Sequence, residues 1–102
     1  LGTDGFGNLP TEYMLHQNYP NPFNPTTVIK YDLPEGRFTV IQVYDILGKQ
    51  IRTLIKGHEE AGFKTKVWDG TDDLGRPMSA GVYLYQIQAG EFTQTRKMML
   101  LK

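Results

Sequence analysis

Hydrophobic and polar residues alternate along most of the chain, in short segments that are separated by turn residues. In TTVIKYDL (26–33), Ile29, Tyr31 and Leu33 fall on one side of an extended chain, and charged residues fall between them on the other side. A period of two residues is the pattern of a β-strand with one buried face. No segment has a convincing 3.6-residue period, so we expect no long helix.

The same pattern predicts an all-β fold with about seven short strands. The predicted strands are residues 13–17, 26–33, 37–45, 49–57, 63–70, 81–90 and 92–102. Turn signals such as Gly48 and Ala89-Gly90-Glu91 separate them at regular intervals, which is typical of an immunoglobulin-like antiparallel β-sandwich. The residues that we expect to be buried in its core are Ile29, Tyr31, Ile41, Val43, Val67, Tyr85 and Ile87.

The segment NYPNPFNPTT (18–27) interrupts the alternation with three prolines. Proline fixes φ and lacks a backbone donor, and it pushes the preceding residue toward extended conformations. We therefore expect a rigid, extended crossing with turns at Asn21 and Asn24, which bends the first strand away and feeds the second. A change of sheet within the segment is one way to do so, and its prolines would block edge-to-edge pairing.

Length and charge narrow the functional classes. A chain of 102 residues fits one domain. Residues 1–12 have no period and read as a linker to an upstream domain, so the domain is placed at 13–102. The 11 basic and 11 acidic residues are scattered, which argues against nucleic acid or an anionic membrane as the main partner. No apolar run reaches the length of a membrane span, and the start at Leu1 suggests a processed piece.

The residues that catalysis would need are mostly missing. Ser79 is the only serine, cysteine is absent, and His16 and His58 belong to no nucleophile–base motif. Two lone histidines also fall short of a zinc site. We therefore expect no enzymatic activity and no cofactor.

Two other clusters have a functional and a plain interpretation. The stretch DGTDDLG (69–75) offers Asp69, Asp72 and Asp73 as oxygen ligands for calcium, but it lacks the alternating D-x-D-x-D-G spacing. A loop with aspartates that cap backbone amides is favoured, and no metal is predicted. The other cluster is an aromatic strip that could stack on sugars, although core packing is favoured for its members. The strip consists of Tyr44, Trp68, Tyr83 and Tyr85.

Three blocks of the sequence resemble the type A C-terminal sorting domain of the type IX secretion system. They are NYPNPFNPTTVIKYDLP, VYDILGKQIRTL and GVYLYQIQAGEFTQTRKMMLLK, and the resemblance covers residues 10–102. The stretch VWDGTDDLGRPMSAGVYLYQI also resembles the immunoglobulin-like domain of the flagellar hook-capping protein.

The sorting resemblance implies a non-catalytic signal at the end of a secreted cargo protein of a Gram-negative bacterium. Its implied partners are the outer-membrane translocon and the sorting peptidase, with the cargo released or held at the cell surface. The residues implied in recognition are Gly81, Tyr83, Tyr85, Lys97, Met98, Met99, Leu100 and Leu101. Two alternatives stay open: a passive immunoglobulin-like module of the hook-cap type, and a carbohydrate-binding module of a secreted enzyme.

Overall fold

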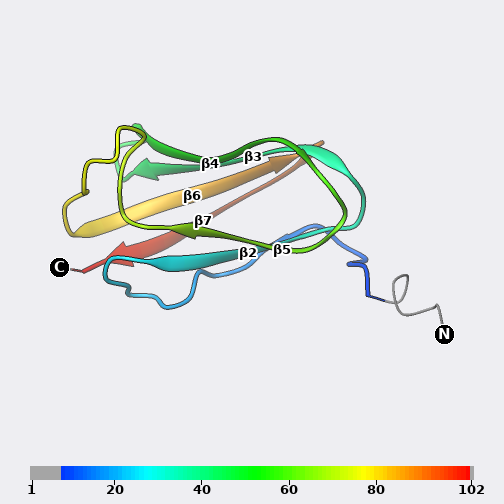
Figure 1. Cartoon of the computed structure of the whole chain (residues 1–102), viewed down its shortest axis with the longest axis horizontal. Helices are drawn as coiled ribbons and strands as arrows, with labels where there is room; N and C mark the ends of the chain where they lie inside the picture. The colour runs from blue at the N-terminus through cyan, green and yellow to red at the C-terminus, as the bar shows by residue number, and fades with distance from the viewer. Residues whose placement is uncertain (1–7, 102) are drawn as a thin grey trace.

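Seven strands form two packed antiparallel sheets in the computed structural model, which describes residues 8–101 (Figure 1). One sheet has the order β1-β2-β5, with β1 at Met14–Leu15, β2 at Thr27–Leu33 and β5 at Gly62–Trp68. The other has the order β4-β3-β6-β7, with β3 at Arg37–Asp45, β4 at Gln50–Glu59, β6 at Gly81–Ala89 and β7 at Phe92–Leu100. The predicted β-sandwich is therefore confirmed. Nowhere in residues 8–101 is there a helix with the length and apolar character that crossing a membrane requires.

The sandwich has two ends that carry different parts of the chain. At one end, residues 9–12 line a hollow together with Met14, Asp32 and Phe63, close to where the chain enters the fold. The opposite end carries the β3–β4 turn, the loop from Asp69 to Ala80 and the end of β7 (Figure 1). The entry of the chain is thus separated from the end of the last strand by the length of the sandwich.

The core contains all but one of the residues predicted to be buried. Ile29, Tyr31, Ile41, Val43, Tyr85 and Ile87 are fully buried. Val67 is 58% exposed, so its predicted burial is wrong. In the β2–β5 register, Trp68 lies opposite buried Thr27 and Lys66 lies opposite buried Ile29. Directly opposed residues share a face, so the inner face of β5 carries Trp68 and leaves Val67 outside.

Two tyrosines bring a hydroxyl group into this core. Tyr31 Oη donates to Glu59 Oε1 at 2.8 Å. Tyr85 Oη donates to the backbone oxygen of His16 at 2.7 Å and accepts from the backbone nitrogen of Asn18 at 2.8 Å. Burial raises the pKa of both phenols, that of Tyr85 to about 12. Both side chains therefore stay neutral and act as hydrogen-bond donors inside the fold.

Candidate functional site

The proline-rich segment lies along the outer edge of β7. The backbone nitrogen of Phe23 donates to the oxygen of Met99 at 3.0 Å, and the nitrogen of Leu101 donates to the oxygen of Phe23 at 2.8 Å. These bonds make a parallel bridge between Phe23 and Leu100. The Phe23 ring is buried and packs 5.7 Å from the ring of Trp68. The segment therefore covers the edge of the last strand and is anchored in the core.

This arrangement corrects the expected change of sheet. The strands on either side of the segment, β1 and β2, are neighbours in the same sheet. The middle of the segment reaches across to β7 of the other sheet, through the bonds of Asn21 and Phe23. The crossing thus closes one open side of the sandwich and returns to its starting sheet, which leaves its prolines where no ladder donors are needed.

Side-chain amides extend the coverage of the β7 edge. Asn21 Oδ1 accepts from the backbone nitrogen of Met99 at 2.9 Å, and Gln17 Nε2 donates to the backbone oxygen of Lys97 at 2.8 Å. These bonds satisfy polar groups of a strand that has no neighbour on this side except the segment itself.

The first half of β7 is tied to β1 in the same way. Arg96 Nε donates to the backbone oxygen of Leu15 at 2.6 Å, and the nitrogen of Leu15 donates to Gln94 Oε1 at 3.0 Å. The two side chains are half-buried and point between the sheets. Arg96 is thus a structural bridge between the two sheets.

The bend of the proline-rich segment is fixed by a buried asparagine. Asn18 is 2% exposed, and its Nδ2 donates to the backbone oxygen of Pro20 at 3.1 Å and to Thr27 Oγ1 at 2.9 Å. Thr27 Oγ1 in turn donates to the same Pro20 oxygen at 2.8 Å. Both ends of the segment are therefore joined by one buried network, as expected where prolines leave backbone oxygens without ladder partners.

The residues implied in recognition divide into an inner and an outer set. Four of them are buried: Tyr83, Tyr85, Met98 and Leu100. A partner cannot touch these side chains while the sheets are packed, so their direct role is in the core. Lys97 is exposed, and Met99 and Leu101 are 41% and 46% exposed. Gly81 is half-buried and pairs with Leu100 where β6 begins.

Lys97 and Met99 of the outer set border a shallow hollow. Its volume is about 290 Å³, and it lies between the proline-rich segment and the outer face of β6 and β7. Val82 lies opposite Met99 in the β6–β7 register, so the two apolar side chains form one wall. The lining residues are Gln17, Asn21, Val82, Lys97, Met98 and Met99. Sequence reasoning missed Gln17, Asn21 and Val82, because their proximity to Lys97 depends on tertiary pairing.

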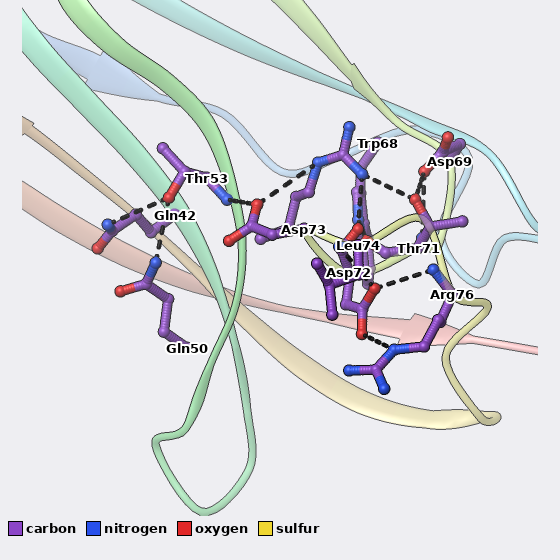
Figure 2. Close-up of polar contacts among 11 residues, drawn as sticks. Gln42, Gln50, Thr53, Trp68, Asp69, Thr71, Asp72, Asp73, Leu74 and Arg76 are labelled. Atoms are coloured by element: carbon purple, nitrogen blue, oxygen red, sulfur yellow. Dashed lines mark hydrogen bonds and ion pairs between the residues drawn. The ribbon is translucent and has the colours of Figure 1, made fainter.

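Two aspartates of the 69–75 loop, Asp69 and Asp72, bind groups of the loop and its end (Figure 2). Asp72 Oδ1 accepts from the backbone nitrogens of Leu74 and Arg76 at 3.0 and 2.9 Å, and its Oδ2 accepts from Arg76 Nε at 2.9 Å. Asp69 Oδ1 accepts from the nitrogen and hydroxyl of Thr71 at 3.1 and 2.5 Å. These bonds lower the pKa of both carboxyl groups, mainly through the Arg76 amide at Asp72 and the Thr71 hydroxyl at Asp69.

The third aspartate of the loop caps an edge strand. Asp73 Oδ1 accepts from the backbone nitrogen of Thr53 at 2.9 Å and lies 3.9 Å from Arg52 Nε (Figure 2). The backbone nitrogen of Asp73 donates to the backbone oxygen of Ile51 at 3.0 Å. The three carboxylates thus point to three separate sets of partners, and no group of three potential metal ligands is found in residues 8–101.

We expect calcium to have no role in the stability of the domain. Adding millimolar calcium should leave the melting temperature unchanged, because the Asp72 carboxylate already accepts bonds from two amides and a guanidinium. Differential scanning calorimetry with calcium and with magnesium as the control measures this. A rise of several degrees with calcium alone, lost in Asp72→Ala, would show that the loop is a calcium site.

Other proposed chemistries are not supported by the positions of their residues. His16 Nε2 lies 2.9 Å from Asp32 Oδ2, and His58 Nε2 lies 3.5 Å from Glu60 Oε2. In the described residues neither histidine contacts Ser79, whose backbone oxygen accepts a bond from Tyr83. The favoured interpretation of the aromatic strip as core packing is confirmed for three of its members and the fourth is half-buried, so the strip forms no exposed platform for sugars. The three core members are Trp68, Tyr83 and Tyr85, with Tyr44 half-buried.

Several solved structures share this fold at low sequence identity. Dimeric latent PorU from Porphyromonas gingivalis has a TM-score of 0.67 at 18% identity, over 87% of this chain and 9% of that chain. PorZ from the same organism, an essential surface component of the type-IX secretion system, has a TM-score of 0.57 at 17% identity, over 86% of this chain and 11% of that chain. FLGD from P. aeruginosa has a TM-score of 0.58 at 20% identity, over 90% of this chain and 73% of that chain. The chain therefore spans about a tenth of PorU and PorZ and most of the FLGD chain.

Sequence comparison defines the family. No curated protein matches the chain in sequence. The family model described as the FlgD Ig-like domain matches residues 24–91, which is two thirds of the chain. The resemblance to the immunoglobulin-like hook-capping domain is thereby confirmed, and the chain belongs to the FlgD Ig-like domain family.

Proposed function

We propose that this immunoglobulin-like domain is a non-catalytic export signal, which directs an attached cargo protein across the outer membrane by the type IX secretion system. Its partners are then the outer-membrane translocon and the sorting peptidase, and its final location is the cell surface or the medium. The domain supplies a portable recognition surface that a cargo joined to its entry end does not cover.

One observation supports this proposal above the others. Residues 18–23 of the first block and residues 92–102 of the last block of the sorting pattern lie outside residues 24–91, the part that the FlgD Ig-like model matches. In the fold these two blocks pair with each other, through Phe23 on one side and Met99 and Leu101 on the other. The parts of the sorting pattern outside the FlgD Ig-like match are thus joined along one edge of the sandwich, which supports a recognition site placed on a common fold.

The comparisons agree with this proposal at the level of the fold. PorZ is a surface component of the type-IX secretion system, and PorU is a latent dimer from the same organism. Each has a region that superposes on most of this chain. Identities below one fifth support a shared architecture alone. FLGD superposes comparably well, so the passive module is the alternative that an experiment must separate.

The experiment is a fusion of the 102-residue chain to the end of an unrelated periplasmic reporter in a host with a type IX system. We expect the reporter in the medium or at the cell surface, as detected by blotting of fractions and by protease accessibility. Lys97→Ala should leave the melting temperature nearly unchanged, because an exposed lysine contributes little to stability. Its export should fall if Lys97 contacts the machinery.

Two controls keep the result interpretable. The natural type IX cargo of the host must be exported in the same cells, and the retained fusion must resist proteolysis as a folded domain. If a folded fusion stays in the periplasm under these conditions, the export role is wrong and the passive hook-cap-like module is the better account. Deleting residues 98–102 is not a suitable test, because Met98 and Leu100 are part of the core.

A further inference from the structure

We infer that the hollow beside Lys97 binds a carboxylate side chain, presented by the partner on an extended segment together with a neighbouring apolar residue. This inference rests on the proposed function for the identity of the partner as a protein of the export machinery. The binding chemistry itself follows from the lining residues and can be measured without that machinery.

The cation in this hollow has no counter-ion in its own domain. Within residues 8–101 no carboxylate lies within ion-pair distance of Lys97 Nζ, and the side chain is exposed. Lys64 on β5, by contrast, lies 3.7 Å from Glu59. The ammonium group of Lys97 is thus available to an external anion at the rim of a concave surface.

The side-chain amide of Asn21 adds a hydrogen-bond donor to the hollow. Asn21 Oδ1 is occupied, because it accepts from the backbone nitrogen of Met99 at 2.9 Å. This fixes the orientation of the amide and turns its NH₂ group away from the strand. No bond from that NH₂ group to residues 8–101 is found, so the group is free to donate to a ligand. An ammonium and an amide NH₂ on the lining of one hollow suit a carboxylate.

Apolar side chains define the rest of the binding surface. Val82 and Met99 face each other across β6 and β7 on the outer face of the sheet, next to Lys97. Met99 is 41% exposed, although long apolar side chains are usually buried. A thioether adapts its shape to different apolar partners, so this wall suits an aliphatic residue beside the acid. The hollow of about 290 Å³ has room for one or two side chains of an extended peptide, not for a folded element.

A pair of short peptides tests this inference on the isolated 102-residue chain. The probes are N-acetyl-Leu-Glu-Leu-amide and its glutamine analogue, which has nearly the same shape without the charge. We expect the acidic peptide to shift the NMR signals of the Lys97 and Met99 amides and of the Asn21 side-chain NH₂ group. Its affinity should be roughly tenfold higher than that of the glutamine peptide, the size of effect that a charged hydrogen bond contributes. Equal binding of the two peptides, or no shift at these groups, would overturn the inference.

Variants of Lys97 separate charge from packing. Lys97→Met keeps the length of the side chain and should lose the preference for the acidic peptide, whereas Lys97→Arg should keep it. Lys56→Met is the matched control, because Lys56 is an exposed lysine on β4 of the same sheet, has no ion pair within residues 8–101 and does not line the hollow. It should bind both peptides like the parent. If Lys97→Met keeps the preference, the lysine does not bind the carboxylate.

The same variants distinguish failure of this inference from failure of the export proposal. If the parent fusion is exported and Lys97→Met is exported equally well, the carboxylate contact is wrong and the export role stands. If the folded parent fusion is not exported, the export role fails whatever the peptides do. Export of parent and Lys97→Arg, with a roughly tenfold loss in Lys97→Met, supports both.

Discussion

Replacing Trp68 by alanine should lower the free energy of unfolding by about 3–5 kcal/mol, the range for large aromatic residues removed from a core. The Trp68 side chain is fully buried and packs between the rings of Phe23 and Tyr83 at 5.7 and 5.4 Å. Its Nε1 also donates to the backbone oxygen of Thr71 at 2.8 Å. The substitution therefore leaves a cavity in the core and removes a buried hydrogen bond. For a domain of this size the melting temperature should fall on the order of 15–30 °C.

The matched control lies on the same strand. Phe63 is 64% exposed, so Phe63→Ala should change the free energy of unfolding by less than about 1 kcal/mol. Thermal and urea denaturation followed by circular dichroism compare the two variants. If Phe63→Ala is the more damaging substitution, the register of β5 is the reverse of the one described and Trp68 faces solvent.

This pair of substitutions addresses the strand where sequence reasoning failed. In FKTKVW the apolar residues Phe63 and Val67 share one face, and two lysines share the other with Trp68. Counting residues favours the first face as the inner one, but the large indole buries more surface than valine. Because β5 is an edge strand, Lys64 and Lys66 can lie half-buried with their aliphatic stems against the core and their ammonium groups near water. Period-two patterning thus identified the strand but not its orientation.

Strands with one consistently apolar face were predicted correctly. In β2, Ile29 and Tyr31 alternate with Lys30 and Asp32, and no competing interpretation exists. In β3 and β6 the inner residues, apart from Ala89 at the end of β6, are β-branched or aromatic, which suits central strands. Local pattern is sufficient in these strands because the polar residues could not occupy the inner face without losing hydration.

The candidate site required information that local pattern does not contain. The prolines between Tyr19 and Thr26 predict an extended segment, but they do not indicate that its neighbour is β7. The run Met98 to Leu101 is apolar throughout, so alternation could not tell which residues face the core. Pairing with β6 decides this: Met98 lies opposite Tyr83 and shares its inner face, which leaves Lys97 and Met99 outside.

Tyr85→Phe should be the second most damaging of the substitutions considered, although it removes a single oxygen atom. The hydroxyl group holds two backbone groups of the segment that leads into the prolines, the oxygen of His16 and the nitrogen of Asn18. Phenylalanine leaves both groups without that partner in a buried place, at a cost of roughly 1–3 kcal/mol each. We expect a total loss on the order of 2–4 kcal/mol and a fall in melting temperature of roughly 10–20 °C.

Tyr44→Phe is the control for loss of a tyrosine hydroxyl group as such. Tyr44 Oη donates to the side chain of Gln42 at 2.6 Å on a half-buried surface, where water can replace it, so the loss should stay below about 1 kcal/mol. Hydrogen exchange supplies the local measurement. The Asn18 amide should exchange slowly in the parent and in Tyr44→Phe, and much faster in Tyr85→Phe. Unchanged exchange at Asn18 in Tyr85→Phe would mean that the proline-rich segment is not held to β6 by this hydroxyl. Its position along β7 would then depend on the bonds of Gln17, Asn21 and Phe23.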